Sequence, residues 1–169
     1  MKVLEVPDYF GYSIFCDDVR QEIGGKATFI GVYRAVIFVH ESFPAVIPKF
    51  VIAINFFQRK SAVRDNAKVR IYLPGEEEDY DKPAQIEGVI GGLQEGAEKI
   101  TTSMQKIPGA DTSFMRIESP LVFTPLILAE PGLIKVRVIL DDELVIRIGQ
   151  LQVLPGDALS ALNPTPPAA

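Results

Sequence analysis

Residues 133–153, LIKVRVILDDELVIRIGQLQV, decide the fold class of this 169-residue chain. Two runs rich in Val, Ile and Leu, residues 133–140 and 144–153, flank the acidic triplet Asp141-Asp142-Glu143. Two apolar, β-branched runs separated by a short polar segment are typical of a β-hairpin. The pattern therefore predicts a hairpin with a polar tip that supplies two strands of a mainly β protein.

Two further segments have clear strand patterns. Residues 50–57 (FVIAINFF) are almost continuously apolar, which predicts a strand buried on both faces. Residues 67–73 (AKVRIYL) alternate between apolar and polar side chains. Because successive strand residues point to opposite faces, we expect the apolar ones in the core and Lys68, Arg70 and Tyr72 in solvent.

The rest of the chain supplies the other strands. Residues 9–16, 28–39, 113–117 and 121–128 are also rich in β-forming residues. About seven to nine strands with short turns favour an antiparallel β-sandwich of the immunoglobulin-like or C2-like kind. We predict a single sandwich domain over residues 1–156, followed by a Pro-rich, flexible tail at residues 157–169.

Residues 83–106 break this strand pattern. Their apolar residues recur every three or four positions, which predicts one inserted α-helix, and Pro83 suits its first turn. Gly88, Gly92 and Gly96 lie four positions apart, so on a helix they form a groove that another backbone can approach closely. We interpret this groove as a surface for a protein partner or for a second copy of the chain. Alternatively, the helix packs on the protein's own sheet, or the segment is partly loop.

A charged segment, residues 17–26 (DDVRQEIGGK), joins two predicted strands. Gly24 and Gly25 can take the positive φ angles of a tight turn, so we expect a hairpin. Its charged side chains form either turn-stabilising ion pairs or a surface for a protein partner: Asp17, Asp18, Arg20, Glu22 and Lys26. No metal site is expected, because the two basic groups compete for the carboxylates.

Residues 15–20 (FCDDVR), Glu22, residues 24–26 (GGK) and residues 29–33 (FIGVY) combine into one pattern. It resembles the FCDD-x-R-x-E-x-GGK opening of an uncharacterised family of small bacterial and bacteriophage proteins. The resemblance extends over residues 12–55. It implies a bacterial or phage origin and a sandwich-like fold, and it carries no activity or ligand.

Composition narrows the classes of function. The net charge of −5, the pI of about 4.9 and the lack of a Lys/Arg run argue against nucleic acids and anionic membranes as partners. The apolar stretches are too short for a membrane helix. One cysteine, Cys16, allows neither an internal disulfide nor a zinc cluster. With no signal-peptide pattern, we expect a cytoplasmic location, or a virion if the protein is phage-encoded.

Acidic residues also gather at positions 76–81 (EEEDYD). A solvated loop is the expectation, since the D-x-D spacing of a calcium loop is missing. The sequence contains no nucleophile-elbow motif that could supply a serine to the single histidine, His40. Asp17 beside Cys16 is expected to raise the pKa of the Cys16 thiol, which makes it a poor nucleophile. The sequence therefore predicts no catalytic residue, metal or cofactor.

The leading hypothesis is a non-enzymatic protein-interaction or structural module, associated with a phage virion or its assembly and binding a protein partner or its own copy. A small-ligand or calcium-binding sandwich is the second hypothesis. An enzyme centred on His40 is the third.

Overall fold

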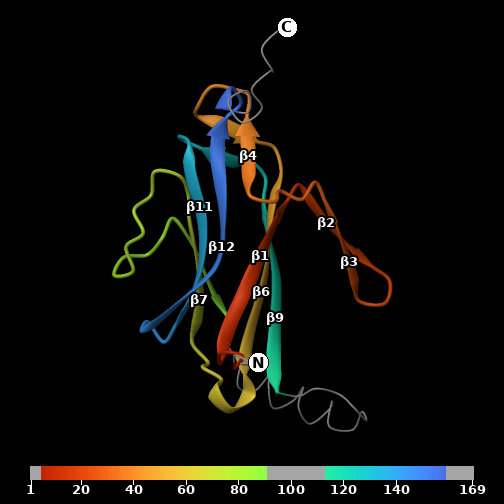
Figure 1. Ribbon diagram of the computed structural model, residues 1–169, viewed down its shortest axis with the longest axis vertical. Coiled ribbons are helices and arrows are strands. Elements are labelled where there is room, and N and C mark those ends of the chain that lie inside the picture. Colours follow the sequence, from red (N-terminus) through yellow and green to blue (C-terminus); the bar gives the residue numbers. More distant parts are fainter. Residues whose placement is uncertain (1–4, 91–112, 159–169) are drawn as a thin grey trace, which may run out of the picture.

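A computed structural model describes residues 5–90 and 113–158 of the chain (Figure 1). Within these ranges the protein is mainly β, with two larger sheets and two small ribbons. A short 3-10 helix, η1 (Lys60–Ala62), follows the central strand of one sheet. The prediction of a mainly β protein with antiparallel sheets is confirmed.

The smaller main sheet has the strand order β1-β6-β9, and both pairings are antiparallel. Its strands are β1 (Tyr9–Cys16), β6 (Phe50–Arg59) and β9 (Phe114–Phe123). The central strand, β6, is buried along nearly its whole length, as its continuous apolar run predicted. Its alternate residues Phe50, Ile52, Ile54 and Phe56 belong to the core and are at most 1% exposed.

The larger sheet has the order β4-β12-β11-β7-β8. Its strands are β4 (Val36–Val39), β12 (Leu144–Pro155), β11 (Gly132–Leu140), β7 (Ala67–Tyr72) and β8 (Ile86–Ile90). The β11–β12 hairpin confirms the prediction from residues 133–153, and Asp141 and Asp142 at its tip have φ angles of 52° and 59°. The sheet is mixed, because β4 pairs with β12 in parallel.

The two small ribbons are β2 (Asp18–Glu22) with β3 (Lys26–Ile30), and β5 (Ala45–Ile47) with β10 (Leu126–Leu128). The predicted strand over residues 28–39 is wrong in its middle. It ends at Ile30, where Gly31 takes a φ of +65°, and the chain then crosses to the larger sheet as β4. Gly24 and Gly25 have φ angles of 82° and 73°, as the predicted turn requires.

The inner faces of the two main sheets share one hydrophobic core. The sheets lie close together where β1 crosses β12: a Cβ at Gly11 would lie 2.8 Å from Ile148, and one at Gly149 would lie 2.7 Å from Ser13. Only glycine permits such an approach of two strands. Ile148 is the extra residue of a bulge in β12 and is 3% exposed, so the bulge turns it into the core.

The predicted helix over residues 83–106 is wrong in its first part. Residues 86–90 form β8, antiparallel to β7, with Glu87 opposite Arg70. The free edge of β7 offers these residues backbone partners, and Gly88 weakens a helix by about 1 kcal/mol relative to Ala. Residues 91–106, which include Gly92 and Gly96, lie outside the described residues.

Candidate functional site

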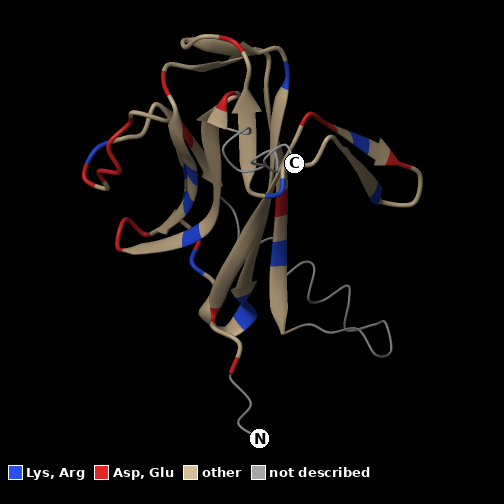
Figure 2. Ribbon diagram, turned by 45° about the horizontal axis from the view of Figure 1, so that its top comes forward, with Lys and Arg blue, Asp and Glu red and all other residues tan. Residues whose placement is uncertain are grey.

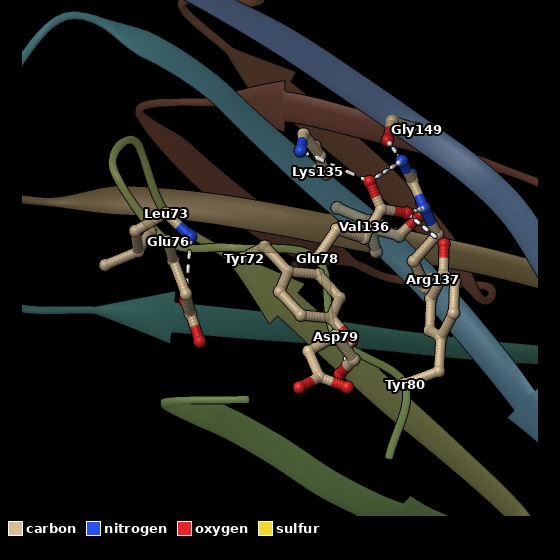
Figure 3. A network of polar contacts seen from close by, with 10 residues as sticks. All are labelled: Tyr72, Leu73, Glu76, Glu78, Asp79, Tyr80, Lys135, Val136, Arg137 and Gly149. Carbon is tan, nitrogen blue, oxygen red and sulfur yellow. Dashed lines mark hydrogen bonds and ion pairs between the residues drawn. The ribbon is translucent and has the colours of Figure 1, made fainter. Parts of the chain in front are cut away.

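The acidic loop, residues 74–82 between β7 and β8, is anchored on the larger sheet (Figure 3). Glu78 accepts hydrogen bonds from Arg137 Nε at 2.5 Å and Nη2 at 3.1 Å, and Lys135 Nζ lies 3.2 Å from its carboxylate. The hydroxyl of Tyr80 donates to the same group. The expectation of a fully solvated loop is therefore wrong for Glu78, whereas Glu77 and Asp81 are exposed.

These neighbours hold Glu78 in its ionised form. Burial alone would raise the pKa of the carboxyl, but hydrogen bonds from Arg137, Tyr80 and Lys135 lower it to about 2. The same contacts occupy its oxygens, which leaves it poorly placed to bind calcium. Among the described residues, no cluster of three or more His, Cys, Asp or Glu could hold a metal ion.

The acidic loop also explains a wrong prediction about β7. Arg70 and Tyr72, expected in solvent, are 6% and 1% exposed. Arg70 donates to Glu87 at 2.5 Å and to the backbone oxygen of Tyr80 at 2.8 Å, and the hydroxyl of Tyr72 donates to the backbone oxygen of Asp79 at 3.3 Å. The alternation along β7 is correct, but the loop covers its outer face.

The two residues considered for catalysis lie on different sheets. Cys16, at the end of β1, is fully buried, and burial followed by the charge of Asp17 raises the pKa of its thiol. A protonated, buried thiol is a poor nucleophile. His40 is exposed and follows β4, at the edge of the larger sheet.

The first two charged residues of the segment 17–26 tie the β2–β3 ribbon to the body. Asp17 accepts a hydrogen bond from the hydroxyl of Tyr33 at 2.5 Å. Asp18 accepts from Lys49 Nζ at 2.6 Å and from the backbone N–H of Val19 at 2.8 Å. The hydrogen bond from Lys49 is the main cause that lowers the pKa of Asp18.

Beyond this base the ribbon extends away from the two main sheets, with charges of both signs along it (Figures 1 and 2). Arg20, Glu22 and Lys26 are exposed. The hydroxyl of Thr28 donates to Glu22 at 3.1 Å, and Arg20 reaches Asp18 only at 4.0 Å. Most of the charged and hydrogen-bonding groups of these side chains are therefore accessible to another molecule.

The tip of the ribbon carries an apolar residue that sequence reasoning missed. Ile23 is 99% exposed, the highest value among the exposed large hydrophobic residues of the described chain. Its signal was available: a β-branched residue directly before Gly24-Gly25, where turns usually place polar residues. Ile23 therefore has no role in the core of the described structure.

The inner face of the ribbon lines a groove against the smaller sheet. Cross-strand pairing places Val19 with Phe29, and Gln21 with Ala27, on this face. The opposite wall is the outer side of β9, and the groove has a volume of about 410 Å³ with these lining residues: Gln21, Gly25, Ala27, Phe29, Arg116, Glu118 and Pro120. The ribbon is thus charged on one side and largely apolar on the other.

Of the three glycines predicted to form a helical groove, only Gly88 lies in the described residues. It is part of β8, and a Cβ at this position would meet nothing within 4 Å. An apolar cleft of about 280 Å³ opens beside it, between the edge strands β8 and β9. The structure brings together Asp18, Arg20, Glu22 and Lys26 on one ribbon, with Asp17 at its base, and it places Gly88 on a different sheet.

Comparison with protein families yields a match over most of the chain. The model of a family of unknown function, DUF6941, matches residues 11–153, a range that runs from β1 to β12 and includes both the ribbon and the acidic loop. Neither the curated proteins nor the solved structures contain a match. Within residues 5–90 and 113–158, no helix is long and apolar enough to cross a membrane.

Proposed function

We propose that this chain, which belongs to the DUF6941 family of unknown function, is a non-enzymatic protein-interaction module whose contact element is the β2–β3 ribbon. The observation that carries the proposal is Ile23, 99% exposed at the tip of a ribbon that pairs with no other described strand. Isolated two-stranded ribbons are marginally stable in water. A protein partner would cover the ribbon and stabilise it.

The ribbon offers three kinds of contact to such a partner. Burial of the Ile23 side chain would contribute about 1.5–3 kcal/mol. The outer edges of β2 and β3 carry backbone groups that a further strand can bind. Arg20, Glu22 and Lys26 supply charges of both signs, which select among partners more than they add to affinity.

Several of the described titratable groups have contacts that give them a structural role in this proposal. The Cys16 thiol is buried and its pKa is raised. Glu78 is held by Arg137 and Lys135, while Arg64 and Lys68 bind the acidic tip of the β11–β12 hairpin at 3.0 and 2.6 Å. These ion pairs fix loops and turns to the sheets, so their role in the proposal is structural.

The body of the molecule serves as a rigid support in this proposal. We propose that the two main sheets form a β-sandwich of the immunoglobulin-like or C2-like kind, which the shared core supports.

The wider role is structural or assembly-associated, in a virion if the chain is phage-encoded, as the resemblance of its opening motif implies. A gene position among capsid or tail genes is the expected result, and an isolated position among metabolic genes would contradict it.

Site-specific photo-crosslinking tests the proposed contact. A p-benzoylphenylalanine in place of Ile23 is expected to give one defined crosslinked protein, identified by mass spectrometry, in cells that express the chain. The same group in place of Ser61, an exposed residue of η1, is the matched control and is expected to give none. Equal products at both positions, or no product at position 23, would count against the ribbon as the contact element.

A further inference from the structure

We infer that the partner of the β2–β3 ribbon is a second copy of this chain, joined to the first through the free edges of their β2 strands. The two ribbons then form one continuous four-stranded sheet, ordered β3-β2-β2-β3 across the two chains. The inference rests on the proposed function, because it names the partner of the same ribbon. It follows from three features: the free edge of β2, the charge order of β2 and the position of Ile23 directly after this strand.

The first feature is the direction of the backbone groups. Among the described strands, β2 pairs only with β3. The N–H of Val19 donates to Asp18 Oδ1 at 2.8 Å, so it points away from β3. Backbone groups alternate in direction along a strand, and the N–H and C=O of Gln21 therefore also point to the free edge. Gln21 is the natural centre for pairing with an identical strand.

The second feature is that β2 is self-complementary about Gln21. A two-fold axis beside this residue pairs the two copies antiparallel, as an isologous contact requires. Arg20 of each chain then faces Glu22 of the other, twice in the dimer. Both side chains are exposed and lie on the same face of the strand, so each ion pair forms without moving the ribbon.

The third feature is the apolar tip. The same register brings Ile23, which directly follows β2, beside Val19 of the other chain. The most exposed large apolar side chain of the described residues is thereby covered by an apolar neighbour. Charge and apolar contacts thus select one and the same register.

Neighbouring registers lack this match. With the axis beside Arg20, the two arginines face each other and Asp18 faces Glu22, so like charges oppose each other throughout. With the axis beside Glu22, the two glutamates face each other. Pairing through β3 about Thr28 places Lys26 opposite Ile30, a charge against an apolar residue. The charge order of β2 therefore acts against alternative pairings of the same edge.

The contact is small. A stable interface buries about 800 Å² on each partner, and one edge of five or six residues supplies less than this. The dimer is expected to be weak and to form in a concentration-dependent way. Such an equilibrium is well suited to a test by charge reversal, because small changes in affinity shift it visibly.

Sedimentation velocity over a concentration series is the test, with the full chain throughout. The wild type is expected to shift from monomer to dimer as concentration rises. Arg20→Glu and Glu22→Arg are each expected to weaken association by about tenfold or more, since each places like charges opposite one another twice. The double variant Arg20→Glu/Glu22→Arg is expected to recover the wild-type association.

An equimolar mixture of the two single variants gives the sharpest result. One chain then carries only acidic groups at both positions and the other only basic groups, so a heterodimer is expected where each variant alone is monomeric. Gln21→Pro is a second, charge-independent variant: it removes the outward N–H while leaving the pairing with β3, and it is expected to abolish the dimer. Asp157→Arg, an exposed change remote from the ribbon in sequence, is the control and is expected to leave the dimer intact.

Three outcomes would overturn the inference: a wild type that stays monomeric at all concentrations, a dimer that no ribbon variant weakens, or single variants that fail to form a heterodimer. Thermal unfolding of each variant checks that the fold is retained, and the heterodimer result itself requires both chains to be folded. A monomeric wild type that still crosslinks to a different protein through position 23 would overturn only the second-copy partner. A monomer that crosslinks to nothing there would overturn the proposed function as well.

Discussion

The acidic loop and the β2–β3 ribbon both carry many charged side chains, but these side chains differ in exposure and in where their partners lie. Glu78 in the loop is bound by Arg137, a side chain 59 positions away that is only 4% exposed. Arg20 and Glu22 in the ribbon are exposed and lie within a few residues of each other. A charged side chain that forms an ion pair with a main sheet fixes its loop in place. A charged side chain whose contacts lie within the ribbon stays exposed, where a partner can contact it.

Removal of Arg137 is expected to have the largest effect on this contrast. Arg137→Met leaves Glu78 against the sheet without its bidentate partner, and the free energy of unfolding should fall by about 3 kcal/mol. Urea denaturation at neutral pH measures it. Arg20→Met in the ribbon, where the side chain is 68% exposed, is the matched control and should change stability by less than about 0.5 kcal/mol. Equal losses of the free energy of unfolding in both variants would contradict the proposed difference between the acidic loop and the ribbon.

Acidification is expected to have the next largest effect. The folded-state pKa of Glu78, about 2, lies below its ordinary value of 4.5, so its contribution is complete above the ordinary value and is lost as pH falls toward 2. The contribution is about 2 kcal/mol, since part of the side chain still contacts water. Glu78→Gln should flatten the stability profile in that window, measured by urea midpoints at several pH values. A wild-type profile and a variant profile that run parallel there would contradict the prediction.

A smaller effect is expected on the inner face of the ribbon. Phe29 is half-buried and pairs with Val19, so Phe29→Ala should cost about 1 kcal/mol, against several for a fully buried aromatic residue. Phe56→Ala in the core of β6 is the comparison variant. Thermal unfolding of both variants compares their losses of stability. A much smaller loss for Phe29→Ala is expected if the ribbon lies outside the core, and similar losses would contradict this.

The smallest effect is expected at the ribbon tip. Ile23→Ser should change the free energy of unfolding by less than about 0.5 kcal/mol, because the side chain has almost no contact with its own chain. The same variant should weaken dimer formation in sedimentation velocity. A residue whose substitution weakens association and leaves stability unchanged belongs to a contact surface. A clear loss of stability would show that the tip is packed.

Local sequence was sufficient for those elements whose partners are close in the chain. The β11–β12 hairpin, the buried central strand β6 and the turn at Gly24-Gly25 could all be predicted. Alternation, continuous apolar runs and glycine conformations are properties of a few consecutive residues.

Other features depended on residues far away in the sequence. Ile86, Val89 and Ile90 fit a helical stripe, but the free edge of β7 binds this segment as a strand. Arg70 and Tyr72 are buried beneath the acidic loop, and Arg70 also binds Glu87 of β8. Ile23 could have been noticed as unusual for a turn, but its near-complete exposure depends on how the ribbon leaves the body.

The sequence by itself determined that the chain is mainly β, where its clearest hairpins turn, and that the segment 17–26 carries charges of both signs. Only the tertiary structure decided which charges are used within the molecule. It brought Arg137 and Lys135 to Glu78 and left Arg20, Glu22 and Ile23 outside. The physical reason is that charges and apolar side chains are stabilised by whatever lies within a few ångströms, and in a β protein those neighbours come from strands far apart in the sequence.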